Sequence, residues 1–273
     1  MDTIRKYPRT PHLTGSRLQP GDEDLSQIPF SLIRNRHLVV EEKIDGANSA
    51  ISFSPDGALL LQSRGHYLTG GYRERHYNLM KQWASIHRDA FYKVLSTRYI
   101  MYGEWMYAKH SIYYDALPSY FMEFDILDRQ TGRFLDTPSR QALTRQMPVC
   151  SVPVLAEGIF QRPEDILCLL GSSRYIREGH LERLQACCLQ SGLDPERCCA
   201  ETDPTTQMEG LYLKIEEDGS VVERLKYVRS SFAQQVQQSE THWIDRPIIP
   251  NGLAVPLETM FLPGGTPWQT PTG

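Results

Sequence analysis

The stretch from Val39 to Asn48 places a lysine, Lys43, at the end of a short expected strand and next to a turn at Gly46. A buried lysine loses its hydration unless another group pairs with it, so a lysine here suggests chemistry. An amine attacks phosphorus only when it is unprotonated, and nearby cations or a metal would lower its pKa. Such an amine forms a phosphoramidate and divides one difficult transfer into two easier ones. We therefore predict a nucleophilic lysine.

Six clusters of one kind, each with charged residues near the end of an expected strand, occur along the chain. In order they are Lys43-Ile44-Asp45-Gly46, Ser63-Arg64-Gly65, Tyr102-Gly103-Glu104-Trp105, Glu123-Phe124-Asp125-Ile126, the segment from Glu209 to Lys214, and Arg224-Leu225-Lys226. Strand alternation places Arg224 and Lys226 on one face. Cations that converge with two carboxylates describe a site for a metal-bound polyphosphate, and an aromatic such as Phe124 could stack on a base.

The elements that must position these clusters follow from periodicity and turn residues. We expect strands over 37–44, 48–54, 58–63, 98–106, 119–127 and 151–160, and a hairpin of 208–216 with 220–228. We expect helices over 74–95, 137–146, 163–170 and 177–190. Thr137 is the expected N-cap of the second helix, with Pro138 at its first position. The predicted class is α+β, with antiparallel sheets and interspersed helices.

Composition bounds the class of protein. A hydrophobic content of 40% with 23% charged residues is typical of globular domains, and no apolar run reaches the roughly 18 residues of a membrane span. The N-terminus lacks the apolar core of a secretory signal, so we expect an intracellular, cytoplasmic protein. The net charge of −4 provides no global basic field, so a nucleic acid would need a local basic groove.

The chain divides into three expected parts. Residues 1–35 form a locally basic arm that packs on the core, residues 36–245 form the main domain, and residues 246–273 form a proline-rich tail that is loose from about 262. The arm either wraps the domain or touches phosphates. The six cysteines do not match common zinc spacing, so reduced thiols are expected and a structural zinc is the alternative.

The six clusters, in this order, resemble the motifs of covalent nucleotidyltransferases, and among these the ATP-dependent RNA ligases of the nick-joining type. The family motifs K-x-D-G, S-R-G, glycine-glutamate, aromatic-aspartate, E-G-x-x-x-K and K-x-K are met in turn, over about residues 37–229. Ala47-Asn48 extends the first motif, as RNA ligases often have it. The last motif departs from the family because Arg224 replaces its first lysine.

The resemblance implies a role for each matching position. Lys43 would carry AMP as the catalytic nucleophile, with Asp45 and Lys226 as catalytic partners. For the nucleoside, Glu42 would read adenine, Phe124 would stack on adenine with Asp125 in support, Glu104 would bind the ribose, and Asn48 and Arg64 would touch the nucleotide or the 5′-phosphate strand. For the phosphates and the metal, Lys214 and Lys226 would hold the α-phosphate, Arg224 would hold a nearby phosphate, and Glu104 and Glu209 would place the metal. The implied cofactors are ATP and Mg²⁺ or Mn²⁺. Two alternatives stay open: Phe124 as a core residue, and Asp45 as a brace of the turn.

The resemblance implies a ligase adenylation domain, ATP-grasp-like in fold, without the oligonucleotide-binding barrel of DNA ligases and capping enzymes, because the segment after Arg229 is short. In those relatives the barrel orients pyrophosphate; here Lys6 and Arg9 of the arm are the candidates. The expected function is ATP-dependent joining of RNA, or DNA, ends that carry a 3′-hydroxyl and a 5′-phosphate, with a repair partner protein and without a membrane. The alternatives are another nucleotidyltransferase, a DNA ligase, and an idle end-binding protein.

Overall fold

The computed structural model describes residues 3–18, 21–22, 24–232 and 247–262. Its strands are β1 (His12–Leu13), β2 (Gln27–Ile28), β3 (His37–Lys43), β4 (Ala47–Phe53), β5 (Leu59–Ser63), β6 (Tyr99–Trp105), β7 (Phe121–Asp128), β8 (Arg133–Leu135), β9 (Cys150–Ser151), β10 (Val154–Ile159), β11 (Gly210–Glu217) and β12 (Ser220–Val228). Its helices are η1 (Phe30–Leu32), η2 (Tyr72–Tyr77), α1 (Asn78–Ile86), α2 (Arg88–Leu95), α3 (Thr137–Thr144), α4 (Glu164–Leu167), α5 (His180–Gln190), α6 (Pro195–Ala200) and η4 (Leu257–Phe261).

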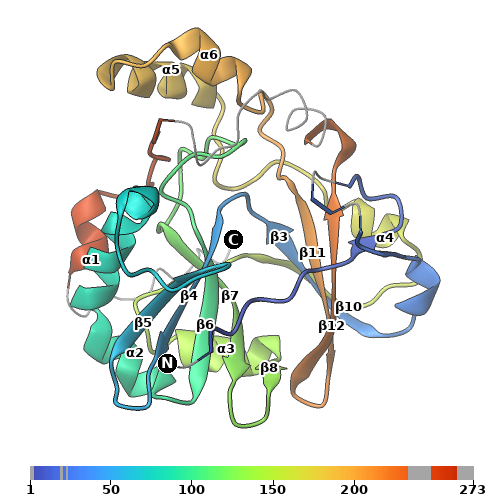
Figure 1. Cartoon of the computed structure of the whole chain (residues 1–273). Coiled ribbons are helices and arrows are strands. Elements are labelled where there is room, and N and C mark those ends of the chain that lie inside the picture. Colours follow the sequence, from blue (N-terminus) through green and yellow to red (C-terminus); the bar gives the residue numbers. More distant parts are fainter. Residues whose placement is uncertain (1–2, 19–20, 23, 233–246, 263–273) are drawn as a thin grey trace.

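All these strands belong to one sheet with the main order β10-β3-β11-β12-β8-β7-β6-β4-β5. The pairs along this order are antiparallel, and β1 joins β12 in parallel. Figure 1 shows two halves, with β3, β10, β11 and β12 on one side and β4, β5, β6 and β7 on the other. The prediction of an α+β class with antiparallel pairing is confirmed, and the strands form one continuous sheet.

Each half of the sheet has its own core. Trp83 of α1 packs with Trp105 and Phe121 in a core beneath the two helices α1 and α2, which lie beside β4 and β5 in Figure 1. The other core joins β3, β11 and α4, and it includes Leu13 of the N-terminal arm. Some side chains of these strands belong to neither core, and Lys43 of β3 is among them.

The sequence of β3 explains why Lys43 is one of these side chains. Leu38 and Val40 are fully buried in the core that β3 shares with β11. Because side chains alternate along a strand, Glu41 and Lys43 lie on the opposite face. The apolar residues of β3 therefore set the direction of its last lysine.

The N-terminal arm crosses from one half of the sheet to the other. The Arg5 carbonyl accepts hydrogen bonds from Gln62 of β5 (2.9 Å) and Tyr102 of β6 (2.8 Å). Further along the arm, β1 pairs with β12 at His12 and Lys226. The dark blue trace in Figure 1 follows this path, so the arm lies over the space between the halves.

Several predicted element boundaries were wrong. The helix expected over 74–95 is divided into η2, α1 and α2, and the break between α1 and α2 is at His87. The His87 Nε2 lies 2.6 Å from the Met260 carbonyl oxygen. The helix expected over 163–170 is only α4, and the strand expected over 151–160 is interrupted at Pro153, which has no N–H to donate. Asp136, rather than Thr137, caps α3 by accepting from the Ser139 N–H (3.0 Å).

Residues 247–262 pack against the main domain. The Asn251 side chain accepts from the Tyr114 N–H (3.0 Å) and donates to the Met106 carbonyl (2.7 Å), which fixes the chain that follows β6. The prediction of a loose tail concerns residues 263–273, which lie outside the described residues. In the part of the chain that the structure describes, no helix is long and apolar enough to cross a membrane. All six cysteines are free thiols.

Candidate active site

Lys43 and Glu209 form the centre of the candidate site. The Lys43 Nζ donates to the Glu209 Oε2 at 2.6 Å, across the pairing of β3 with the start of β11, where Lys43 lies opposite Gly210. Glu209 is buried, while about a fifth (21%) of the Lys43 side chain is exposed. A Cβ at position 210 would lie 1.9 Å from the Tyr227 carbonyl oxygen, so the glycine permits the strand contact that places Glu209.

Glu104 lies beside this pair. Burial raises the pKa of Glu104 to about 8, and Lys43 and Arg64 act to lower it. Its Oε2 is buried without a hydrogen-bond partner among the described residues. Asn48 of β4 is directly opposite Glu104 of β6, so their side chains share a face, whereas Arg64 is exposed after β5. The structure thus brings these three predicted residues to the same edge as Lys43.

Asp45 makes the contacts expected of a residue that braces the turn around Gly46, which was the alternative to a catalytic role. Its Oδ2 accepts from the Ser111 N–H (2.8 Å) and the Ile112 N–H (3.2 Å), and His110 lies 3.5 Å away. Asp45 also adds negative potential at Lys43. Asp45 therefore ties the turn that follows Lys43 to the chain after β6, while it contributes to the charge of the site.

Lys226 is the second lysine of the site. It is close enough to Lys43 that the two charges interact, and its pKa is lowered by burial and then by Lys43. Its Nζ lies 2.5 Å from the Asp22 Oδ2 of the N-terminal arm. We call Lys43, Asp45, Glu104, Glu209 and Lys226 the lysine site.

The structure contradicts the expectation that cations lower the pKa of Lys43. Burial lowers this pKa, but Glu209, Glu104 and Asp45 together raise it above its ordinary value. The carboxylates contribute more than Lys226 because one of them contacts the ammonium group directly. Lys43 is therefore held as an ammonium ion, and nucleotide binding would have to change its surroundings before it attacks.

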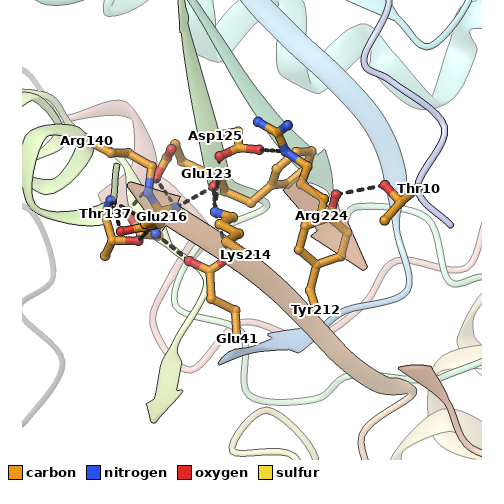
Figure 2. A network of polar contacts seen from close by, with 12 residues as sticks. Thr10, Glu41, Glu123, Asp125, Thr137, Arg140, Tyr212, Lys214, Glu216 and Arg224 are labelled. Carbon is orange, nitrogen blue, oxygen red and sulfur yellow. Dashed lines mark hydrogen bonds and ion pairs between the residues drawn. The ribbon is translucent and has the colours of Figure 1, made fainter. Parts of the chain in front are cut away.

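Two predicted phosphate ligands lie in a separate cluster. Lys214 is fully buried and forms ion pairs with Glu41 (2.8 Å) and Asp125 (3.1 Å), while Arg224 donates to Asp125 at 2.9 Å (Figure 2). Arg140 of α3 joins them through Glu41 and Glu123. We call Glu41, Glu123, Asp125, Arg140, Lys214 and Arg224 the buried charge network. Its three cations balance its three carboxylates, so it links β3, β7, β11, β12 and α3 without a net charge.

A bulge in β7 explains how the network is completed. Tyr102 of β6 pairs with Asp125, but the next residue of β6 pairs with Glu123, so Phe124 is the extra residue. The carbonyl that the bulge frees accepts from Arg140 (2.6 Å) and from Lys214. The cations therefore contact both the carboxylates and this backbone group.

Phe124, the expected adenine-stacking residue, is covered by the N-terminal arm. The Tyr7 ring packs edge-on against it with centroids 5.0 Å apart, and only 8% of Phe124 is exposed. The Tyr7 hydroxyl donates to Asp125 (2.5 Å) and contacts the Tyr212 hydroxyl (2.8 Å). In this arrangement Phe124 is a core residue, as the alternative interpretation proposed, and a base could stack on it only if Tyr7 moved.

Glu42 lies on the face of β3 opposite to Lys43. Burial raises its pKa to about 7, against the lowering effect of Ser173 and Arg174. The structure therefore does not bring its carboxyl into the lysine site.

Sequence reasoning missed the partners that complete these clusters. Glu41 and Arg140 belong to no motif, although Glu41 shares a strand face with Lys43 by simple alternation. Asp22 lies in an arm whose basic residues, His12 among them, drew attention, whereas it is the acidic Asp22 that contacts both His12 and Lys226. Arg9, expected to face pyrophosphate, instead pairs with Asp24 at 2.6 and 2.7 Å.

The lysine site suits a magnesium ion that shares its ligands with a substrate. Glu104 offers an unpartnered buried carboxylate oxygen, and Glu209 adds a second carboxylate nearby. No group of three histidine, cysteine or acidic residues within the described ranges forms a metal cage. Mg²⁺ is commonly held by one or two carboxylates together with water and substrate phosphates, so two carboxylates are a sufficient protein contribution.

Comparison with solved structures identifies the fold. Mutants of a Naegleria gruberi RNA ligase match this chain: one with AMP and Mn has TM-score 0.54, 16% identity and coverage of 86% of this chain and 59% of that one. An apo mutant has TM-score 0.53 and 16% identity, and the match covers 85% of this chain and 58% of that one. A mutant with ATP and Mn has TM-score 0.52 and 14% identity, and the match covers 77% of this chain and 54% of that one. The chain spans somewhat more than half the length of those proteins. A search of curated proteins found no match.

The fold is thus the nucleotidyltransferase type found in RNA ligases, with the lysine site between the two halves of its sheet. A model of the family described as RNA ligase matches residues 36–228, well over half of the chain. The protein belongs to the RNA ligase family.

Proposed function

We propose that this protein is an ATP-dependent RNA ligase that forms a lysyl-AMP intermediate on Lys43. One observation carries the proposal: the Lys43 amine lies 2.6 Å from Glu209, with Glu104 and the second lysine Lys226 within electrostatic reach. A nucleophile, a phosphate-binding cation and two carboxylates are the groups that nucleotidyl transfer requires. Family membership and the ATP- and AMP-bound states of the matching Naegleria proteins support this reading.

In the first step, the Lys43 ammonium group releases a proton to solvent, and the neutral amine attacks the α-phosphorus of ATP. The N–P bond forms as the bond from the α-phosphorus to the bridging oxygen breaks, and pyrophosphate leaves with the electron pair. Lys226 is placed to neutralise charge on the α-phosphate, and Glu209 orients the attacking amine. Bound Mg²⁺, held by Glu104 and Glu209, would supply further charge neutralisation.

In the next two steps, AMP passes from Lys43 to a 5′-phosphate end of RNA, and a 3′-hydroxyl then attacks that activated phosphate. The N–P bond breaks in the former step, and AMP is the leaving group in the latter. Asn48 and Arg64 lie at the edge of the lysine site, where they would meet the nucleotide or the 5′-phosphate strand.

We infer that residues 36–245 form the adenylyltransferase domain, with residues 1–35 as an N-terminal arm and residues 246–273 as a proline-rich C-terminal tail; the described parts of both pack on this domain. The contacts of the arm with β5, β6 and β12, and of Asn251 with the chain after β6, support this division. The cytoplasmic location and the repair partner protein stay predictions.

The test is label transfer from ATP labelled at the α-phosphate, with Mg²⁺, followed by a denaturing gel and peptide mapping. We expect a covalent adduct on the peptide that contains Lys43, none with Lys43→Ala, and an unchanged adduct with Lys93→Ala, which removes an exposed lysine of α2. Sealing of labelled RNA with a 5′-phosphate should follow the same pattern.

Each alternative gives a distinct result. Equal labelling from ATP and GTP would indicate another nucleotidyltransferase, and preferential sealing of DNA would indicate a DNA ligase. The absence of any adduct in the wild-type protein would overturn the proposal and leave an end-binding protein.

A further inference from the structure

The N-terminal arm is fixed against β12 at Lys226 and, two residues further along the strand, at Val228. The Lys226 N–H donates to the Pro11 carbonyl (3.0 Å), and the Arg17 N–H donates to the Val228 carbonyl (3.1 Å). His12 of β1 lies opposite Lys226 in the register of the two strands. Backbone hydrogen bonds therefore set the position of the arm relative to this lysine, independently of any side chain.

Side chains of the arm continue this attachment to the Lys226 ammonium group. The Asp22 Oδ2 lies 2.5 Å from the Lys226 Nζ and 3.2 Å from the His12 Nε2. The His12 Nδ1 lies 2.7 Å from the Ser16 hydroxyl, which accepts from the Val228 N–H at 2.9 Å. The hydrogen bonds thus run from the Val228 backbone of β12 through Ser16, His12 and Asp22 to the Lys226 side chain of the same strand.

The chemistry of the groups orients this chain. The cations around Asp22 hold its pKa well below the ordinary value against the opposing effect of burial, so its carboxylate is ionised and only accepts hydrogen bonds. The His12 Nε2 must therefore carry the hydrogen that it shares with Asp22. His12 is fully buried, so its ring holds one orientation and presents that hydrogen to the carboxylate.

We propose that Asp22 and His12 are positioning residues that hold Lys226 for its contact with the α-phosphate, an inference that rests on the proposed function. Lysine is a point charge on a flexible four-carbon stem, so its position in a site depends on a partner. Lys226 also lies near the like charge of Lys43. Each lysine has a carboxylate partner, Glu209 for Lys43 and Asp22 for Lys226, and the two partners keep the ammonium groups in a fixed arrangement.

Arg9 and Asp24 supply a matched comparison within the same turn. The Arg9 guanidinium binds Asp24 at 2.6 and 2.7 Å and the Gly21 carbonyl at 2.5 Å, and it lies 3.6 Å from the Asp22 Oδ1. Asp24 shapes the turn through Arg9, but Lys226 is not among its contacts. A substitution at Asp24 therefore disturbs only the turn, whereas a substitution at Asp22 disturbs the turn and also the contact with Lys226.

The experiment measures single-turnover formation of lysyl-AMP over a range of ATP concentrations, for Asp22→Asn, Asp22→Glu and the control Asp24→Asn. We expect Asp22→Asn to reduce the maximal rate about 10- to 100-fold, since small displacements of a positioned group have effects of this size. The ATP concentration for half-maximal rate should change much less. Asp22→Glu should recover part of the rate, and Asp24→Asn should resemble the wild type.

A double-mutant cycle separates positioning from a general structural role. In a Lys226→Met background, Asp22→Asn should cause no further loss of rate, because Asp22 acts through Lys226. Thermal unfolding of each variant accompanies the kinetics, and Asp22→Ser repeats the test if Asp22→Asn melts at a lower temperature.

Three outcomes would overturn the inference while the proposed function stands. These are equal rates for Asp22→Asn and Asp24→Asn, a rate that rises with Asp22→Asn because the carboxylate blocks the phosphate, and a full additional loss in the Lys226→Met background. A wild-type protein that forms no lysyl-AMP would overturn the proposed function and the inference together.

Discussion

Lys43 and Lys214 extend from neighbouring paired strands, yet they belong to different charge clusters. Lys43 lies opposite Gly210, and Lys214 is four residues further along β11, or about 13 Å at the usual rise of a strand. Lys43 binds Glu209 at the edge of the sheet, whereas Lys214 binds Glu41 and Asp125 in the interior. The first lysine is partly exposed, whereas the second is buried among the carboxylates that it pairs with.

This difference predicts the effect of Lys214→Met. Removal of Lys214 leaves Glu41 and Asp125 with only Arg140 and Arg224, so the buried network keeps two cations for three carboxylates, and one uncompensated buried charge costs about 3–5 kcal/mol. We expect the free energy of unfolding in urea to fall by about this amount, with lysyl-AMP formation retained where the variant is folded. Lys93→Met on α2 is the control. Unchanged stability with loss of lysyl-AMP would instead place Lys214 at the phosphate.

A second prediction concerns Phe124, which is packed against Tyr7. If adenine stacks on Phe124 after Tyr7 shifts, Phe124→Leu should weaken ATP binding by about tenfold, since stacking on an aromatic contributes about 1–3 kcal/mol per base. Leucine keeps most of the apolar volume, so thermal stability should change little. Equilibrium binding of ATP measures the effect, and an unchanged affinity would leave Phe124 as a core residue alone.

A third prediction separates the nucleotide from the RNA strand at Arg64. Arg64 is exposed, and its positive charge is near enough to the lysine site to lower the pKa of Glu104. We expect Arg64→Ala to leave lysyl-AMP formation within about threefold of wild type and to slow sealing about tenfold or more, because one charge-assisted phosphate contact is lost. The same assays on Arg162→Ala, which removes a distant exposed arginine, should show no change. An equal fall in both steps would place Arg64 at the nucleotide instead.

The fourth prediction is a pH dependence of stability at Glu42. Burial raises the pKa of Glu42 from 4.5 to about 7, so the folded state keeps a proton that the unfolded state releases between these values. Stability should therefore fall as pH rises through this window, by on the order of 3 kcal/mol for the shift of this one group. Glu42→Gln stays neutral and should lose that dependence.

Urea unfolding at pH 5 and pH 8 measures this effect, with Glu157→Gln on the exposed side of β10 as the control. The stability of Glu42→Gln relative to wild type should increase from pH 5 to pH 8, and that of Glu157→Gln should not. A parallel pH dependence in all three proteins would show that Glu42 is ionised without cost in the folded state.

The sequence by itself predicted the α+β class, most strands and the central pair of the site. Lys43 and Glu209 could be predicted because their motifs lie at strand ends, and antiparallel pairing brings the end of one strand to the start of the next. Boundaries at Pro153 and His87 were missed because a single interruption outweighs the periodicity on either side of it.

Only the tertiary structure decided which charges serve the site and which serve the core. Lys214, Arg224 and Lys226 look alike in the sequence, but burial and partners from distant segments divide them: Asp125 of β7 pairs with Lys214 and Arg224, and Asp22 of the arm pairs with Lys226. Local patterns specify the face of a strand on which a charge lies. The group that neutralises that charge comes from elsewhere in the chain, and the free energy of a buried charge depends on that group.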